Sequence, residues 1–143
     1  MKRRDFIQRL AAGALCGALA ASTGGCAHSL PYVRSTRKDR LLIVQRSDFG
    51  EGPHALLENP QSSRAIYLRR FPDDTFAAVS TRCTHRGCAV APAGNRLACP
   101  CHGSEYTFEG EVLNGPAERP LFRYEVTADA DAIYIELPAS AKP

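Results

Sequence analysis

Four cysteines and two histidines lie within one short stretch of the sequence, in an arrangement suited to a metal centre. They form two Cys–His pairs, each with a further cysteine close by: Cys83, His85 and Cys88 in the first group, and Cys99, Cys101 and His102 in the second. Thiolate sulfur and imidazole nitrogen are the ligands that zinc and iron–sulfur centres use. Two loops brought together by a β-scaffold would let such ligands converge, so the stretch predicts a metal centre with mixed ligands.

Other chemistries use the same residue types. A zinc site would account for the two Cys–His pairs but would leave Cys88 and Cys101 without a role. Two structural disulfides suit an exported protein, yet they need no paired histidines. A cysteine nucleophile beside a histidine needs a third group to orient the base, and the sequence indicates none. At the level of residue types these alternatives stay open beside an iron–sulfur site.

The elements that must position these residues are expected to be β-strands. Runs with strand-type patterning, bounded by turn residues, occur before and after the cysteine stretch, at 40–46, 64–70, 75–81, 105–116 and 122–137. The fourth run is expected to be a hairpin that turns at Glu109–Gly110, and the fifth a hairpin around an Asp-rich turn. No segment after the N-terminal region has helical periodicity. The sequence therefore predicts a small all-β domain over residues 41–138, with the cysteine stretch inserted between strands.

The first 26 residues have the features of a targeting segment. A basic start is followed by an apolar run, Leu10–Ala21, which is shorter than the roughly 20 residues that a membrane-spanning helix needs. Arg3-Arg4 with Phe6-Ile7 resembles a bacterial twin-arginine signal, which predicts export to the periplasm. That route carries folded proteins, so it suits a chain that acquires its cofactor in the cytoplasm.

The residues after this leader are expected to form a linker at 27–40, which is polar and contains Pro31. The small residues that end at Cys26 are similar to a lipoprotein cleavage site, which would leave Cys26 acylated. Cleavage near Ala20 or Ala27, or an uncleaved leader acting as a weak anchor, are the alternatives. The leader or Cys26 would then attach the protein to a membrane.

The charge distribution excludes one class of partner. The leader holds four of the 18 basic residues and one of the 15 acidic residues, which leaves 14 of each in the rest of the chain. A domain without excess positive charge has no electrostatic attraction to phosphate backbones. No nucleic-acid partner is expected.

Two segments of the cysteine stretch resemble a known family. "CTHRGC" (83–88) and "CPCHGS" (99–104) are similar, nearly residue for residue, to the two cluster-binding boxes of Rieske iron–sulfur proteins. The resemblance implies an antiparallel β-sandwich with an inserted cluster-binding subdomain, whose loops span about 81–120. It implies a [2Fe–2S] cluster in which Cys83 and Cys99 bind one iron and His85 and His102 the other. Cys88 and Cys101 would form a disulfide between the two loops.

The same resemblance carries an expectation about reduction potential. Two neutral imidazoles in place of thiolates make the oxidised cluster less negative, and Rieske centres span about −150 to +300 mV. Ser104 and Tyr106 occupy positions that in high-potential members donate hydrogen bonds to a bridging sulfide and to a cysteine sulfur. Gly115-Pro116, in "LNGPAERP", resembles the proline loop that covers the cluster. The sequence is thus similar to the high-potential branch.

The resemblance implies electron transfer between redox partners, and three departures bear on which partners. Arg86 stands where subunits of quinol-oxidising cytochrome bc complexes usually have leucine, Glu118 stands where a second proline is common, and the leader is shorter than their membrane anchor. These features favour a periplasmic electron carrier, or the small subunit of an oxidoreductase such as a molybdenum-containing arsenite oxidase. The alternative is the Rieske subunit of a quinol:cytochrome c oxidoreductase. The expected partners are cytochrome c, a quinol-oxidising complex or a molybdenum-containing large subunit. A ferredoxin of an aromatic-ring dioxygenase is disfavoured by the leader, the disulfide cysteines, Ser104 and Tyr106.

Overall fold

The regular secondary structure consists almost entirely of antiparallel strands, in several of which buried and more exposed residues alternate. The computed structural model describes residues 30–139. Their strands and their one helix run in the order β1 (Thr36–Lys38), β2 (Leu41–Gln45), α1 (Arg46–Phe49), β3 (His54–Leu57), β4 (Ile66–Arg70), β5 (Phe76–Ser80), β6 (Ala91–Ala93), β7 (Arg96–Ala98), β8 (Glu105–Tyr106), β9 (Val112–Asn114), β10 (Arg123–Ala128) and β11 (Ala132–Glu136). Within this part of the chain, no helix is both long and apolar enough to cross a membrane.

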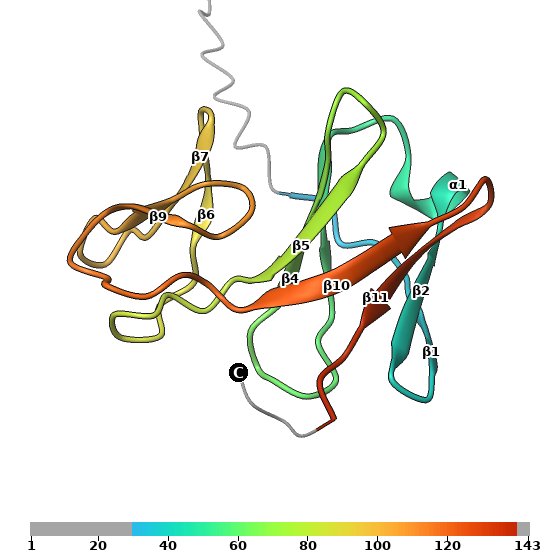
Figure 1. Ribbon diagram of the computed structural model, residues 1–143, viewed down its shortest axis with the longest axis horizontal. Helices are drawn as coiled ribbons and strands as arrows, with labels where there is room; N and C mark the ends of the chain where they lie inside the picture. Colours follow the sequence, from blue (N-terminus) through green and yellow to red (C-terminus); the bar gives the residue numbers. More distant parts are fainter. Residues whose placement is uncertain (1–29, 140–143) are drawn as a thin grey trace, which may run out of the picture.

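The larger sheet has seven strands in the order β1-β2-β11-β10-β5-β4-β3 and curls around an apolar core. Strand β10 joins its two halves, because its first residues pair with β5 and its later residues pair with β11. Each strand sends every second side chain inward. The inward residues include Leu42 and Val44 of β2, Ile66 and Leu68 of β4, and Ile133 and Ile135 of β11. The sheet thus encloses its own core like a sandwich (Figure 1).

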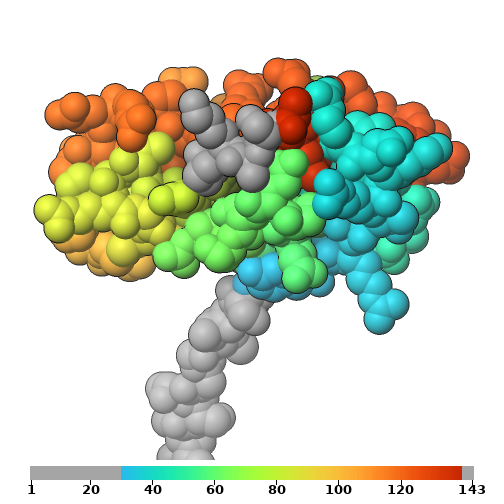
Figure 2. Space-filling model, turned by 90° about the horizontal axis from the view of Figure 1, so that it is seen from below, coloured from blue at the N-terminus to red at the C-terminus, as the bar shows by residue number. Residues whose placement is uncertain are grey.

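The smaller sheet, in the order β6-β7-β8-β9, forms a separate lobe beside the larger one (Figure 1). The chain enters this lobe after β5 and leaves it before β10. Strands β4 and β5 are covered on both faces, because Ile66, Leu68 and Ala78 point into the first core while Tyr67 and Val79 point into a second. The second core continues into the lobe through Leu97 and Tyr106. Figure 2 shows the same division, with the lobe in yellow and orange at one end of the molecule and the β1–α1 region in cyan at the other.

The structure confirms the all-β fold with an inserted lobe. Each run of residues expected to form a strand or a hairpin contains one or two of the observed strands. The hairpin of β8 and β9 turns over Thr107–Gly110, which includes the expected Glu109–Gly110. Four strands lie outside those runs: β1, β3, β6 and β7. Strand β1 falls at the end of the segment expected to be a linker at 27–40, so regular structure begins before residue 41. The expected leader, with Cys26, lies outside the described residues.

Candidate metal centre

Two loops with matching backbone geometry carry the six cysteine and histidine residues. The amide of Cys83 donates to the carbonyl oxygen of Cys88, and the amide of Gly87 donates back to Cys83. The second loop repeats both bonds, from Cys99 to Ser104 and from Gly103 to Cys99. Gly87 and Gly103 have φ angles of +78° and +80°, a region that residues with a Cβ rarely occupy. Each loop is therefore held in a closed turn around its first cysteine.

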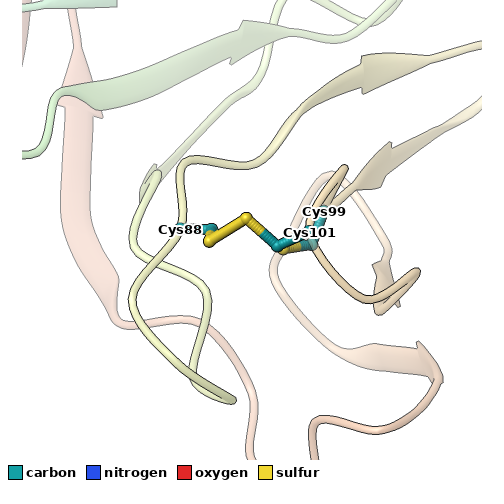
Figure 3. Close-up of side chains that lie close together, drawn as sticks. All are labelled: Cys88, Cys99 and Cys101. Atoms are coloured by element: carbon teal, nitrogen blue, oxygen red, sulfur yellow. A yellow bond between two sulfur atoms is a disulfide. The ribbon is translucent and has the colours of Figure 1, made fainter.

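A disulfide between Cys88 and Cys101 joins these loops, with 6.5 Å between the Cα atoms (Figure 3). The pairing that the resemblance implied is thus present. The sulfur atoms of Cys88, Cys99 and Cys101 all lie within 4.8 Å of one another, yet these three cannot act together as ligands, because metals bind thiolates and two of the sulfurs are in the disulfide. The close approach of the three sulfurs marks where the loops meet.

The remaining two cysteines are free and buried, and the two histidines lie together. Cys83 is 2% exposed and Cys99 3% exposed. The imidazole rings of His85 and His102 lie 4.9 Å apart at an interplanar angle of 88°. Nδ1 of His85 is buried and has no hydrogen-bond partner among residues 30–139. A buried nitrogen without a partner is costly unless a bound group uses its lone pair. Two thiols and two imidazoles at one site fit the mixed donor set of a Rieske centre.

The two free thiols differ in their acidity. Burial raises the pKa of the Cys83 thiol, but hydrogen bonds from the Tyr106 hydroxyl and from the backbone of His85 outweigh it, and the net pKa is lowered. Burial raises the pKa of Cys99, and Cys83 adds to that rise. Ionising both neighbouring thiols is unfavourable without a nearby cation, because the two thiolates would repel each other. A metal held by these residues would supply that positive charge, and its binding would release the thiol protons.

Tyr106 directs its hydroxyl group at the Cys83 sulfur. The oxygen lies 3.3 Å from Sγ of Cys83 and accepts a hydrogen bond from the amide of Thr84. Burial, and then the hydrogen bond with Cys83, raises the pKa of Tyr106, so the hydroxyl keeps the proton that it donates. The ring is fully buried in the second core. Its position is therefore fixed by packing as well as by hydrogen bonds.

Ser104 and the segment after β9 complete one side of the site. The Ser104 hydroxyl is fully buried and accepts a hydrogen bond from the amide of Ala117. Because the oxygen serves as acceptor there, its own proton is free for a group bound at the site. Ala117 directly follows Gly115-Pro116, which are joined by a cis peptide bond. The segment that resembles the proline loop is thus attached to the second cysteine loop.

One residue of the site was missed by the sequence analysis. The hydroxyl of Thr84 donates to the carbonyl oxygen of Arg119 at 2.6 Å and lies 3.1 Å from the Tyr106 hydroxyl. It thereby ties the first cysteine loop to the proline-loop segment and contacts the residue that approaches the Cys83 sulfur. The only sequence signal for this role was the position of Thr84 between Cys83 and His85, because a single threonine in a loop forms no recognisable motif.

Comparisons with known proteins agree with this geometry. A family model for the Rieske [2Fe–2S] domain matches residues 39–125. The cytochrome b6-f complex iron-sulfur subunit of Chlorobaculum tepidum is 31% identical, over 95% of this chain and 76% of that protein. The corresponding subunit of Chlorobaculum thiosulfatiphilum is 30% identical, over 94% and 75%.

Solved structures give the same result. The cyanobacterial plasma membrane Rieske protein from Synechocystis superposes with a TM-score of 0.57 at 27% identity, over 64% of this chain and 94% of that one. The carbazole 1,9a-dioxygenase complex of oxygenase and ferredoxin contains a chain with a TM-score of 0.56 at 22% identity, over 69% and 94%, and this likeness supports the fold alone. The chain belongs to the Rieske [2Fe–2S] family, and it transfers electrons by means of a Rieske-type cluster.

Proposed function

We propose that Cys83 and Cys99 bind one iron of the cluster as thiolates and that His85 and His102 bind the other through imidazole nitrogen. The observation that carries this assignment is the set of donors at one site: two buried free thiols, two adjacent imidazoles and an unpartnered buried nitrogen, Nδ1 of His85. Bound there, a [2Fe–2S] cluster supplies one-electron redox chemistry. The expected domain at 41–138, with its loops at about 81–120, is part of this proposal.

The reduction potential of the bound cluster is proposed to lie in the high range of the family. Tyr106 donates to a sulfur that would bind iron, and Ser104 has a free hydroxyl proton beside the second cysteine loop. Both donors stabilise added negative charge, so both favour the reduced state. Low-temperature electron paramagnetic resonance on the purified protein tests this. A Rieske-type signal with ascorbate alone supports the proposal, and a signal that needs dithionite contradicts the high potential.

The role that we propose first is that of a carrier of single electrons between protein partners on the exported side of the membrane. The twin-arginine-type leader supports this location, and an acylated Cys26 or an uncleaved leader would provide attachment. Arg86 supports the choice of protein partners because it is exposed and directly follows His85 in the chain. A quinol ring docking against that imidazole would have to displace water from a guanidinium group, which is unfavourable without a paired anion. A cytochrome c and a molybdenum-containing large subunit are both compatible partners.

A second role, as the iron–sulfur subunit of a quinol-oxidising cytochrome complex, is supported by the relatives, which are subunits of cytochrome b6-f complexes. Membranes from cells that contain or lack this protein distinguish the two roles. If quinol-dependent cytochrome reduction is lost with the protein and restored with it, the second role is correct. If that activity is unchanged, the carrier role is supported. Replacing Arg86 by leucine provides a further check, since it should raise quinol affinity only in the second role.

A further inference from the structure

We propose that an arginine-lined pocket beside the first cysteine loop docks an acidic surface of the redox partner. The pocket has a volume of about 780 Å³ and lies between the loop that carries Cys83 and His85 and the segment 119–123 that leads into β10. Arg82, Arg119 and Arg123 all contribute to its lining. The proposal rests on the proposed function as an electron carrier between proteins and names the chemistry of the surface that this carrier would meet.

The three guanidinium groups are exposed and uncompensated. None of them has a carboxylate within salt-bridge distance anywhere in residues 30–139, where the ion pairs join other arginines to their partners. Glu118, next to Arg119 in the chain, is exposed and makes no ion pair with it. Arginine presents a planar fork that binds carboxylates through two parallel hydrogen bonds. Three guanidinium groups without ion-pair partners around one pocket therefore form a site for carboxylate groups.

Several arginines elsewhere in the described chain contact groups of the protein itself. Arg46 pairs with Asp74 at 2.8 Å, Arg96 pairs with Glu105 at 2.8 Å, and Arg69 lies over the ring of Phe108. The chain outside the leader carries equal numbers of basic and acidic residues. Uncompensated positive charge beside the site must therefore be matched by negative charge elsewhere.

Part of that negative charge lies at the far end of the molecule. The exposed turn between β10 and β11 carries Asp129 and Asp131, and Figure 1 shows this turn at the end opposite the small lobe. Uncompensated positive charge is therefore concentrated locally, at the pocket beside the proposed iron ligands. Such a local positive patch orients an acidic partner during encounter and raises the association rate at low ionic strength.

The position of the pocket favours a protein partner over a small anion. Its wall includes His85 and Cys83, so a carboxylate-bearing surface seated on the arginines would lie directly over the proposed ligands. Pro120 and Phe122 add apolar surface to the lining, which suits the mixed character of protein interfaces. Electron transfer requires such proximity. In the step concerned, the reduced protein gives one electron to a ferric haem, which becomes ferrous, and no bond forms or breaks.

The test compares two variants with the same change in net charge. Arg119→Gln with Arg123→Gln removes two charges from the pocket, whereas Arg37→Gln with Lys38→Gln removes two exposed charges from β1, at the other end of the molecule (Figure 1). The probe is a basic c-type cytochrome, used either unmodified or with its lysines succinylated so that its surface is acidic. Stopped-flow mixing of the full-length reduced protein with each oxidised cytochrome gives the rate constant, and isothermal titration of the oxidised proteins gives the affinity.

The pocket variant should react with the acidic cytochrome about 2- to 30-fold more slowly at low ionic strength, because each of the two lost surface ion pairs is worth about 0.2–1 kcal/mol and about 1.36 kcal/mol corresponds to a factor of ten. The β1 variant should keep the wild-type rate constant, and added salt should reduce the difference between the variants. Affinity should fall in parallel, and the reduction potential should stay unchanged. The inference would be overturned by equal rate constants for the two variants, or by a preference of the wild-type protein for the basic cytochrome.

A further arm separates a small anion from a protein surface. If citrate or inorganic phosphate, added at constant ionic strength, binds the wild-type pocket while the acidic cytochrome binds both variants equally, the pocket is a small-anion site and the proposal is wrong. Failure of the proposed function is detected independently by electron paramagnetic resonance and redox titration. The binding measurement needs no electron transfer, so it tests the pocket whatever the potential is.

Discussion

Replacing Tyr106 by phenylalanine removes one hydroxyl group from the site and leaves the packing of the ring intact. That hydroxyl lies 3.3 Å from the Cys83 sulfur. Its proton has two acceptors within reach, the sulfur and the Thr84 hydroxyl oxygen at 3.1 Å. Thr84 already donates its own proton to Arg119, so its oxygen competes with the sulfur. A thiolate is the stronger acceptor because it is charged, and we expect the Tyr106 hydroxyl to donate its hydrogen bond to the sulfur.

The size of the effect follows from the free energy of one hydrogen bond. A typical intramolecular hydrogen bond contributes about 0.5–1.5 kcal/mol. At about 1.36 kcal/mol and about 59 mV for each factor of ten in a one-electron equilibrium, the loss corresponds to about 20–65 mV. Because the bond is stronger when the cluster is reduced and more negative, Tyr106→Phe should lower the potential by up to this amount.

Redox titration followed by circular dichroism or electron paramagnetic resonance measures the change, with iron content determined for each sample. Tyr134→Phe is a matched control, because Tyr134 donates to Asp129 on the turn between β10 and β11, far from the site. The control should keep the wild-type potential. An unchanged or raised potential in Tyr106→Phe, at full iron content, would refute the assignment of Tyr106 as a donor to the site.

Three further changes test other parts of the structure. Ser104→Ala should lower the potential and also destabilise the protein by about 1–3 kcal/mol, because the amide of Ala117 loses its buried acceptor; redox titration and denaturant unfolding measure the two effects, and a change in neither would contradict the described role. Cys88→Ser removes the bridge to Cys101, a constraint worth about 3 kcal/mol for a loop of this length, and should speed iron release to a chelator; release at the wild-type rate would mean that the bridge does not hold the loops. Asp129→Asn should destabilise the protein at neutral pH, because backbone hydrogen bonds and Tyr134 hold the pKa of Asp129 below its ordinary value of 3.8. That contribution is present above the unfolded-state pKa and disappears as pH falls through the lower native pKa, so stability curves of variant and wild type should converge in acid, and a constant gap would disprove the linkage.

The long strands could be predicted because their side chains alternate within the sequence itself. Strand β4 is an exception, since Ile66, Tyr67 and Leu68 form a continuous apolar run. The structure explains this run, because β4 is covered on both faces, by the main core on one side and by the second core on the other. The cysteine and histidine stretch stood out in the sequence for a different reason. Cysteine and histidine are rare enough that their spacing alone carries information.

The strands that were missed are short and have no pattern of their own. Strands β6 and β7 have three residues each, and β6 contains Pro92, which weakens a strand prediction. They form because pairing with each other and with β8 satisfies their backbone groups, a long-range condition that local propensity does not express. Thr84 was missed on similar grounds, since its role depends on the carbonyl group of Arg119, 35 positions away in the chain.

The proposed ligands differ in burial, and this difference determines from which side a partner can approach the site. Cys83 and Cys99 belong to the second apolar core, together with Tyr106 and Leu97, whereas His102 is exposed. Partners therefore cannot approach from the sulfur side, where the protein interior holds the proposed hydrogen-bond donors. They can approach from the imidazole side, which adjoins the pocket of free arginines. The proposed donors Tyr106 and Ser104 are thus buried, whereas the pocket arginines lie on the exposed side, where a substitution can alter partner choice while those two donors stay in place.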